Sequence, residues 1–189
     1  MIIHTAMKNL IRVVLLLIMT AGLSSCEKVR SIFDVEFDTT LSGDLEIDIQ
    51  DMEVLKSAEV YAFQAEVSVD PLDNEDIADY IDNIKEMNVD DVILSVEYVN
   101  KQDVVFKSGT YFRVANYANE VTWTLSGDWP IVEGTEITLE DLGGTYDALE
   151  KILDTKGVFT VSTEGTCTET NVFIVIRLGI DTKVTASPL

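Results

Sequence analysis

The chain has 189 residues, and its 34 Asp and Glu outnumber its 13 Lys and Arg, which gives a formal net charge of −21 at pH 7. An acidic surface of this kind repels phosphate backbones and anionic headgroups, so the composition argues against nucleic-acid binding. The only histidine is His4, close to the N-terminus.

The first 25 residues have the features of an export signal. They contain no Asp or Glu, carry Lys8 and Arg12, continue with a short apolar stretch and end in small residues. The apolar stretch is shorter than the roughly 20 residues that a membrane-spanning helix needs. This order of features predicts a cleaved signal peptide. Either Met1 or Met7 is the initiator, and Met7-Lys8 gives the more typical start.

The signal ends in Leu23-Ser24-Ser25-Cys26, which resembles the bacterial lipobox. The resemblance implies that the Cys26 thiol receives a diacylglycerol, that residues 1–25 are removed, and that the new N-terminus is acylated. Several acyl chains anchor a protein stably, whereas one chain binds a membrane only marginally. We therefore expect residues 26–32 to be a lipidated tether and residues 33–189 to form a single domain. An ordinary secretory signal that happens to end near a cysteine is the alternative.

Removal of residues 1–25 also restricts the available chemistry. The mature chain loses His4 and with it every imidazole, which leaves no Ser-His-Asp or Cys-His catalysis and no histidine metal site. Cys167 then has no partner within the chain, so the domain depends on its core and not on disulfides. The sequence therefore predicts no catalytic residue and a protein that is not an enzyme.

Two runs of strict alternation follow the tether. Apolar side chains alternate with acidic ones over residues 33–38 and again over residues 44–50. A period of two predicts strands with one buried face and one face in water. Ser42-Gly43 lies between the runs and predicts a turn, so we expect an opening hairpin.

A strand is predicted over residues 60–69, and a helix is predicted to follow it as far as about Met87. Asp73 or Asn74 is placed to cap this helix, and its inner face is indicated by isoleucines at helical spacing, Ile77, Ile81 and Ile84.

Four acidic residues surround the start of that helix, namely Asp70, Asp73, Glu75 and Asp76. Their carboxylates are hard oxygen ligands, and calcium is therefore the one cofactor for which the sequence offers candidate residues. Their spacing does not match an EF-hand loop. Helix capping and favourable charge at a helix start explain the same four residues, and we prefer that interpretation.

The rest of the chain predicts several short strands and one more helix. The strands are expected at 91–99, 103–107, 110–116, 120–126, 135–139, 157–165 and 171–184, and the helix at about 145–154. Glu164-Gly165 is predicted to turn between the last two strands. The last strand is expected at the centre of a sheet, because Val172 to Ile176 is apolar on both faces. Many short strands with two brief helices predict a mainly β fold, an antiparallel β-sandwich that is immunoglobulin-like or related.

Two tryptophans are candidates for a binding surface. Trp123 shares a predicted strand face with Val121 and Leu125, so we expect it to be buried. Trp129 follows a Gly-Asp turn and precedes a proline, so we expect it to be exposed and name it as the candidate binding aromatic.

The mature chain resembles the envelope lipoproteins of Bacteroidota. The resemblance rests on the lipobox, on Phe-Asp-Val-Glu-Phe at 33–37, and on Asp-Ile-Ala-Asp-Tyr at 76–80 leading into 92–98. It implies a sandwich that is lipid-anchored in the cell envelope, at the outer membrane. The mixed charge of residues 27–30 favours the periplasmic face over the cell surface.

Asp38-Thr39-Thr40 is similar to the O-glycosylation sequon of that group, which makes Thr39 a candidate modification site. The alternative is a turn between two strands.

The leading functional hypothesis is a non-enzymatic envelope lipoprotein that contacts the bilayer through acylated Cys26 and binds another envelope protein or serves a structural role. The alternative is a carrier for an apolar small molecule or lipid held between the sheets. A carboxylate-dependent hydrolase is the third hypothesis, because acidic residues are plentiful but no pair is identified. A filled core favours the first hypothesis, and a large apolar cavity favours the second.

Overall fold

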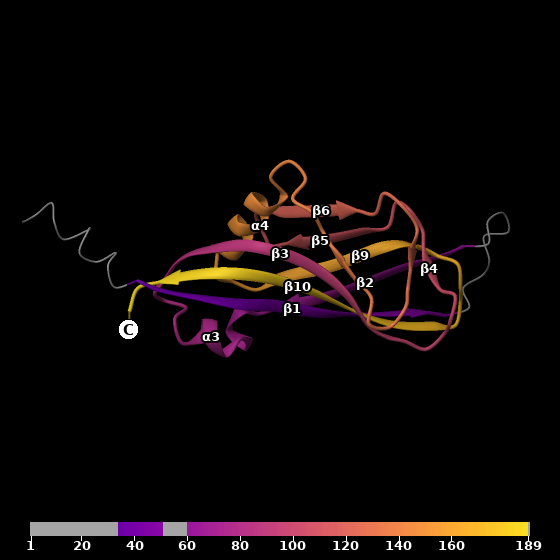
Figure 1. Ribbon diagram of the computed structural model, residues 1–189, viewed down its shortest axis with the longest axis horizontal. Helices are drawn as coiled ribbons and strands as arrows, with labels where there is room; N and C mark the ends of the chain where they lie inside the picture. The colour runs from indigo at the N-terminus through magenta and orange to yellow at the C-terminus, as the bar shows by residue number, and fades with distance from the viewer. Residues whose placement is uncertain (1–33, 51–59, 189) are drawn as a thin grey trace, which may run out of the picture.

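A computed structural model describes residues 34–50 and 60–188 as two antiparallel sheets packed in two layers, with two short α-helices (Figure 1). This confirms the predicted mainly β sandwich. The predicted signal peptide, Cys26 and the tether lie outside the described residues. Within the described part of the chain, no helix is long and apolar enough to cross a bilayer.

The first sheet consists of three long strands and one short strand in the order β1-β10-β3-β8. Their bounds are β1 (Val35–Ile49), β3 (Ile84–Val99), β8 (Glu136–Thr138) and β10 (Val172–Ala186). β1 pairs with β10 over its whole length, from Val35 opposite Ala186 to Ile49 opposite Val172. The prediction that the last strand lies at the centre of a sheet is therefore confirmed.

The second sheet is built around β9, which lies between β2 and β5, because Glu164 pairs with both Gln64 and Tyr111. β6 pairs with β5, and β4 joins β7 to the far end of β9. The bounds are β2 (Tyr61–Val69), β4 (Val105–Phe106), β5 (Tyr111–Ala115), β6 (Glu120–Thr124), β7 (Trp129–Pro130) and β9 (Phe159–Cys167).

β1 is one continuous strand, so the predicted hairpin with a turn at Ser42-Gly43 is wrong. Gly43 lies in the middle of the ladder, opposite Leu178 of β10. A Cβ on Gly43 would lie 2.8 Å from Val69 Cγ2 and 2.9 Å from Val67 Cγ1 of β2. Glycine is needed here because the second sheet approaches the backbone closely, and a turn plays no part.

The prediction of a helix reaching Met87 is also wrong, because α3 spans only Glu75–Ala78. Its predicted cap is confirmed, since Asn74 Oδ1 accepts a hydrogen bond from Ile77 N at 3.2 Å. A short 3-10 helix, η2 (Pro71–Asp73), precedes it. Ile84 and Met87 belong to β3 and are buried, with a register shift in the pairing to β10 between them. A β-bulge therefore produces the three-residue spacing that resembles a helix.

Glu164-Gly165 does not form the predicted turn, because β9 continues to Cys167. A Cβ on Gly165 would clash with Thr110 Oγ1, so this glycine also permits close packing. The chain reverses later, over residues 168–171, where Asn171 has a φ of 53°. The second predicted helix is confirmed as α4 (Thr145–Leu153).

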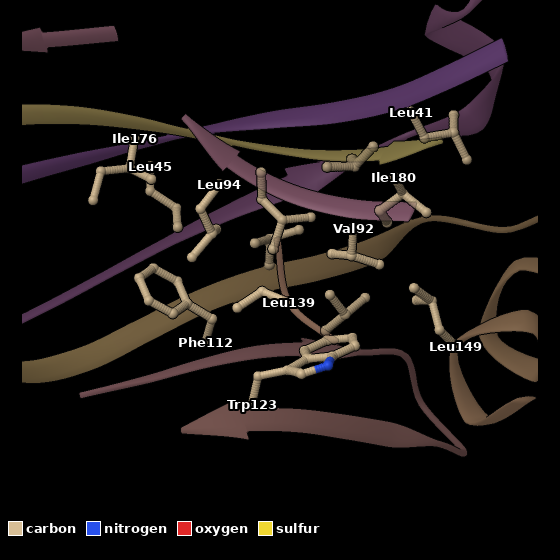
Figure 2. Close-up of a cluster of buried hydrophobic side chains, with 14 of the residues drawn as sticks. Leu41, Leu45, Val92, Leu94, Phe112, Trp123, Leu139, Leu149, Ile176 and Ile180 are labelled. Atoms are coloured by element: carbon tan, nitrogen blue, oxygen red, sulfur yellow. The ribbon is translucent and has the colours of Figure 1, made fainter. Parts of the chain in front are cut away.

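Large apolar side chains fill the space between the sheets (Figure 2). The first sheet contributes Leu41, Leu45, Val92, Leu94, Ile176 and Ile180, and they face Phe112, Trp123, Leu139 and Leu149. Each of these side chains is at most 5% exposed. Leu149 comes from α4, which covers one flank of the core next to β3 and β6 (Figures 1 and 2).

Candidate interaction site at one end of the sandwich

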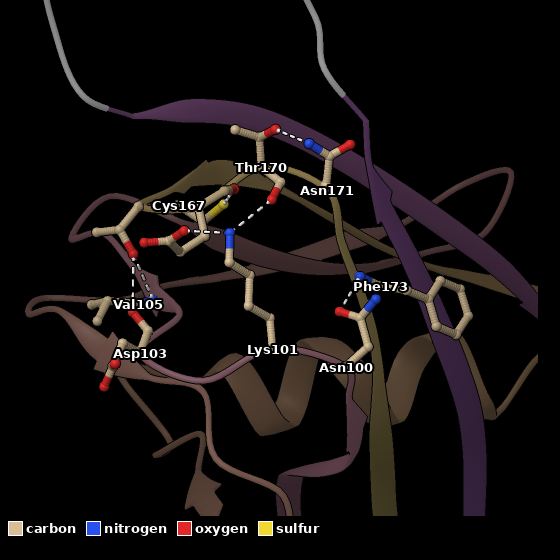
Figure 3. A network of polar contacts seen from close by, with 10 residues as sticks. Asn100, Lys101, Asp103, Val105, Cys167, Thr170, Asn171 and Phe173 are labelled. Atoms are coloured by element: carbon tan, nitrogen blue, oxygen red, sulfur yellow. Dashed lines mark hydrogen bonds and ion pairs between the residues drawn. The ribbon is translucent and has the colours of Figure 1, made fainter.

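Two loops meet at the end of the sandwich that lies opposite Val35 and Ala186 (Figures 1 and 3). One loop, residues 100–104, connects β3 to β4, and the other, residues 168–171, connects β9 to β10. Strand pairing sets their positions, because Val99 of β3 is opposite Ile174 of β10.

Side chains of the first loop hold the second loop in place (Figure 3). Lys101 Nζ forms an ion pair with Glu169 Oε2 at 2.6 Å and donates to the carbonyl of Thr170 at 3.1 Å. Asn100 N donates to Phe173 O at 3.1 Å, and Phe173 N donates to Asn100 Oδ1 at 2.9 Å. The charge of Lys101 is therefore compensated locally, and these contacts join the two loops into one unit.

Thr168 secures the same loops on the β4 side. Its Oγ1 accepts from Val105 N at 3.0 Å and donates to Asp103 O at 3.4 Å, while its backbone N donates to Val105 O at 3.1 Å. Asp103 has a φ of 62°, in the left-handed region that Asp and Asn tolerate better than most residues.

A groove of about 550 Å³ lies beside this unit, lined by residues 99–103 and 131–133. Its volume is within the range of pockets that bind small molecules or single side chains of a partner. Val132 is 54% exposed and offers an apolar contact. Asp103 and Glu133 bring negative charge to the same groove. The groove is therefore suited to an apolar side chain flanked by positive charge.

Cys167 is the last residue of β9. The side chain is fully buried, and Sγ donates to the carbonyl of Glu169 at 3.0 Å. Burial raises the pKa of the Cys167 thiol. A buried thiol with a raised pKa lacks the thiolate character that a nucleophile needs.

Trp129 was expected to be exposed, and this prediction is wrong. It is 7% exposed, and its ring makes edge contacts with Phe106 and Phe112 at centroid distances of 6.0 and 6.4 Å. Pairing of β7 with β4 brings the ring into the core. Trp123 is 3% exposed, which confirms its predicted burial, and its Nε1 donates to Glu140 O at 3.1 Å.

The acidic residues considered for calcium lie around η2 and α3. Asp70 Oδ1 accepts from Leu72 N at 3.0 Å and so caps η2, and Asp73 lies within the first turn of η2. Glu75 and Asp76 occupy the first turn of α3. No group of three or more His, Cys, Asp or Glu side chains in residues 34–50 and 60–188 is arranged to hold a metal ion.

Thr39 lies within β1, opposite Thr182 of β10, where a turn was the alternative interpretation. It is half-buried, and its Oγ1 accepts from Asn74 Nδ2 at 2.9 Å. Asn74 Nδ2 also donates to Thr40 O at 3.0 Å, which ties the segment before α3 to β1. Glycosylation of Thr39 stays a prediction, and it would have to replace the contact with Asn74.

No family model matches the chain, and no curated protein matches it significantly. Among solved structures, it is similar to the decameric BFDV capsid protein, with 6% identity over 79% of this chain and 99% of that chain and a TM-score of 0.41. It is also similar to Desmodium yellow mottle tymovirus, with 8% identity, coverage of 82% and 90%, and a TM-score of 0.30. For Turnip yellow mosaic virus the identity is 5%, the coverage 82% and 96%, and the TM-score 0.30. These similarities are too weak to carry an argument about function.

Proposed function

We propose that this chain is a lipid-anchored protein of the bacterial cell envelope and acts as a non-enzymatic module that binds another envelope protein. The observation that carries the proposal is the sequence Leu23-Ser24-Ser25-Cys26 at the end of a short apolar stretch, with polar sequence resuming at once. Acyl chains on Cys26 would hold the domain at the outer membrane, on its periplasmic face.

The short segment of sequence between Cys26 and β1 supports this arrangement. Only residues 27–34 separate Cys26 from Val35. A fully extended segment of that length spans at most about 29 Å. The Val35 end of the sandwich would therefore stay close to the bilayer.

The groove lined by residues 99–103 and 131–133 lies at the other end of the domain. β1 has 15 residues, which is about 50 Å at the usual rise of a strand. An anchor at Cys26 would thus present the groove lined by residues 99–103 and 131–133 away from the bilayer, where a second protein can reach it.

The filled interior favours an interaction module over a carrier for an apolar ligand. Phe63 and Phe106 stack between the sheets with centroids 4.3 Å apart, and Phe106 in turn contacts Trp129. Aromatic rings therefore occupy the place where a carrier would hold its ligand. The groove instead offers Val132 beside Asp103 and Glu133, which suits an extended, basic protein segment with one apolar side chain.

The anchor is tested by replacing each cysteine in turn, because the chain supplies its own control. In cells fed an alkynyl fatty acid, we expect Cys26→Ser to lose the acyl label and to leave the membrane fraction. Cys167→Ala removes the other cysteine and is expected to keep both the label and the membrane location. A Cys26→Ser protein that is labelled and membrane-bound like the parent would refute the anchor. Cleavage without any acyl label in the parent would show an ordinary secretory signal.

The partner is tested by photo-crosslinking in native membranes. Val132 and Val158 are both 54% exposed, but only Val132 lines the groove. We expect a photoreactive residue at position 132 to form one discrete adduct, identified by mass spectrometry as a basic segment, and expect its yield to fall with salt. The same residue at position 158 should give no such adduct. Equal adducts at both positions, or none at position 132, would contradict the proposal.

A further inference from the structure

The outer faces of the two sheets differ in chemistry. On the first sheet, β1 directs a carboxylate outward at almost every second residue, namely Glu36, Asp38, Asp44, Glu46 and Asp48. On the second sheet, the outward positions are mostly neutral hydroxyl and amide groups, namely Gln64, Ser68, Tyr111, Thr122, Thr124, Thr160, Ser162 and Thr166. The charged side chains on this second face are Glu66, Glu120, Glu164 and Arg113, so it carries fewer carboxylates per strand than β1 does.

This less acidic face contains a groove of about 370 Å³ across β2, β9 and β5. Strand register arranges its polar side chains in two adjacent rows. Gln64, Glu164 and Tyr111 are opposite one another in the first row. In the second row, Glu66 and Arg113 are both opposite Ser162. We call this site the row groove.

Two hydrogen bonds fix the orientation of the groups in the row groove. Tyr111 Oη donates to Glu164 Oε2 at 2.6 Å, and this bond raises the pKa of Tyr111, so the phenol stays protonated. Arg113 Nε donates to Ser162 Oγ at 3.3 Å, and Nη1 lies 3.9 Å from Glu120 Oε2. With Nε used and Nη1 in only a long contact, the guanidinium retains N–H donors for a ligand.

We propose that the row groove binds a segment of a neutral polysaccharide. Sugar hydroxyls both donate and accept hydrogen bonds, and the row groove supplies donors from Arg113 and Gln64 and acceptors from Glu66, Glu164 and Ser162. The ring of Tyr111 adds an apolar surface with a polar tip, which matches the mixed faces of a sugar ring. The groove is open and not enclosed, which fits part of a longer chain.

Other ligand classes fit less well. Glu66 and Glu164 repel an anion, and the polar lining gives little to an apolar molecule. Thr and Tyr are common in strands because their side chains fit a pleated, half-buried surface. That preference does not explain why Arg113 lines the same groove as Glu66 and Glu164.

The test uses the full-length protein and immobilised hexasaccharides of β-1,4-glucose, β-1,4-xylose, β-1,4-mannose and α-1,4-glucose, with hexagalacturonate as an acidic probe. We expect saturable binding to at least one neutral probe. Arg113→Gln should weaken it by about tenfold or more, because buried sugar hydroxyls would lose a charged donor. Arg177→Gln is the matched control, since Arg113 and Arg177 are 42% and 44% exposed but Arg177 is on the acidic sheet face. It should leave the affinity unchanged.

Tyr111→Phe separates the hydroxyl from the ring. It should weaken binding less than Tyr111→Ala, and urea unfolding of each variant confirms that the fold is retained. The proposal is overturned if no neutral probe binds, if hexagalacturonate binds more tightly than every neutral probe, or if Arg177→Gln and Arg113→Gln reduce binding equally.

Discussion

Replacing Gly43 with alanine tests how closely the two sheets approach each other. Gly43 lies at the middle of β1, and an added Cβ would lie 2.8 Å from Val69 and 2.9 Å from Val67. Carbon atoms in van der Waals contact are normally about 3.5–4.0 Å apart. The new methyl group would therefore overlap two branched side chains of β2 by roughly 0.7 Å, and β2 or β1 would have to shift.

The expected magnitude is a balance of two terms. Overpacking a filled core costs about 1–3 kcal/mol. Alanine recovers about 0.5–1 kcal/mol of the backbone entropy that glycine loses in a strand. We therefore expect Gly43→Ala to lower the free energy of unfolding by about 0.5–2 kcal/mol, the difference between these two terms.

The decisive measurement is a double-mutant cycle with Val69→Ala. Val69 is 6% exposed, so its truncation alone should cost about 2 kcal/mol. In Gly43→Ala/Val69→Ala, the new methyl group occupies space that Val69 vacates, and the double variant should be more stable than the sum predicts by about 1 kcal/mol. Urea unfolding followed by tryptophan fluorescence gives all four values, because Trp123 and Trp129 are both buried. An unchanged stability for Gly43→Ala, or strict additivity, would refute the close approach, and both are expected if Gly43 formed a solvent-exposed turn.

Three further outcomes follow from single side chains. Tyr146→Phe should lower the free energy of unfolding by about 1–2 kcal/mol, measured by urea unfolding, because Tyr146 Oη donates to Leu139 O at 2.9 Å and accepts from Val92 N at 3.3 Å. The backbone N–H of Tyr146 holds the pKa of Asp141 below its usual value, so the stability from this carboxylate is present above about pH 4 and is lost as the pH falls through the folded-state pKa. The urea midpoint should therefore fall less steeply with acid in Asp141→Asn than in the parent. Cys167 should react with a thiol reagent only on unfolding, and rapid labelling of the native protein would contradict its burial.

Alternation was the most reliable signal in the sequence, because it reports a property of each strand by itself. The acidic and apolar residues of β1 alternate where one face contacts the core and the other contacts water. The apolar run at Val172 to Ile176 likewise predicted that β10 lies between two other strands, and it does. In both cases the deciding information lies within about ten residues.

Glycine was an ambiguous signal, because the same residue serves two purposes. Gly43 and Gly165 both follow a polar residue and were predicted to form turns. In the fold, each provides room for a side chain from elsewhere in the chain, Val69 of β2 for Gly43 and Thr110, just before β5, for Gly165. Those neighbours are distant in sequence or lie on the other sheet, so no local pattern identifies them.

The sequence also did not predict the contact between the loops at 100–104 and 168–171, because the residues that meet there are distant in sequence. Lys101 and Glu169 are far apart in sequence, and only the pairing of β3 with β10 brings their loops together. Trp129 was placed on the surface because β7 has two residues, too few for alternation to be recognised. Neither the ion pair nor the burial of this ring has a signature in the adjoining sequence.

The difference between the two sheet faces gives the acidic residues a role that does not involve a ligand. β1 is a 15-residue strand at the edge of its sheet, and a long edge strand can pair with a second copy. Its outward carboxylates would repel the same strand of another molecule. The cations nearby are already engaged within the chain, Arg177 with Asp44 at 2.8 Å and Lys183 with Glu36 at 2.9 Å. Exposed ion pairs of this kind add little to stability, so keeping neighbouring copies apart is the stronger reason for so much charge on this face. If the proposed anchor holds the protein at a membrane surface, its copies would meet often, and the face of the second sheet, which carries fewer carboxylates than β1, would be the one left available for binding.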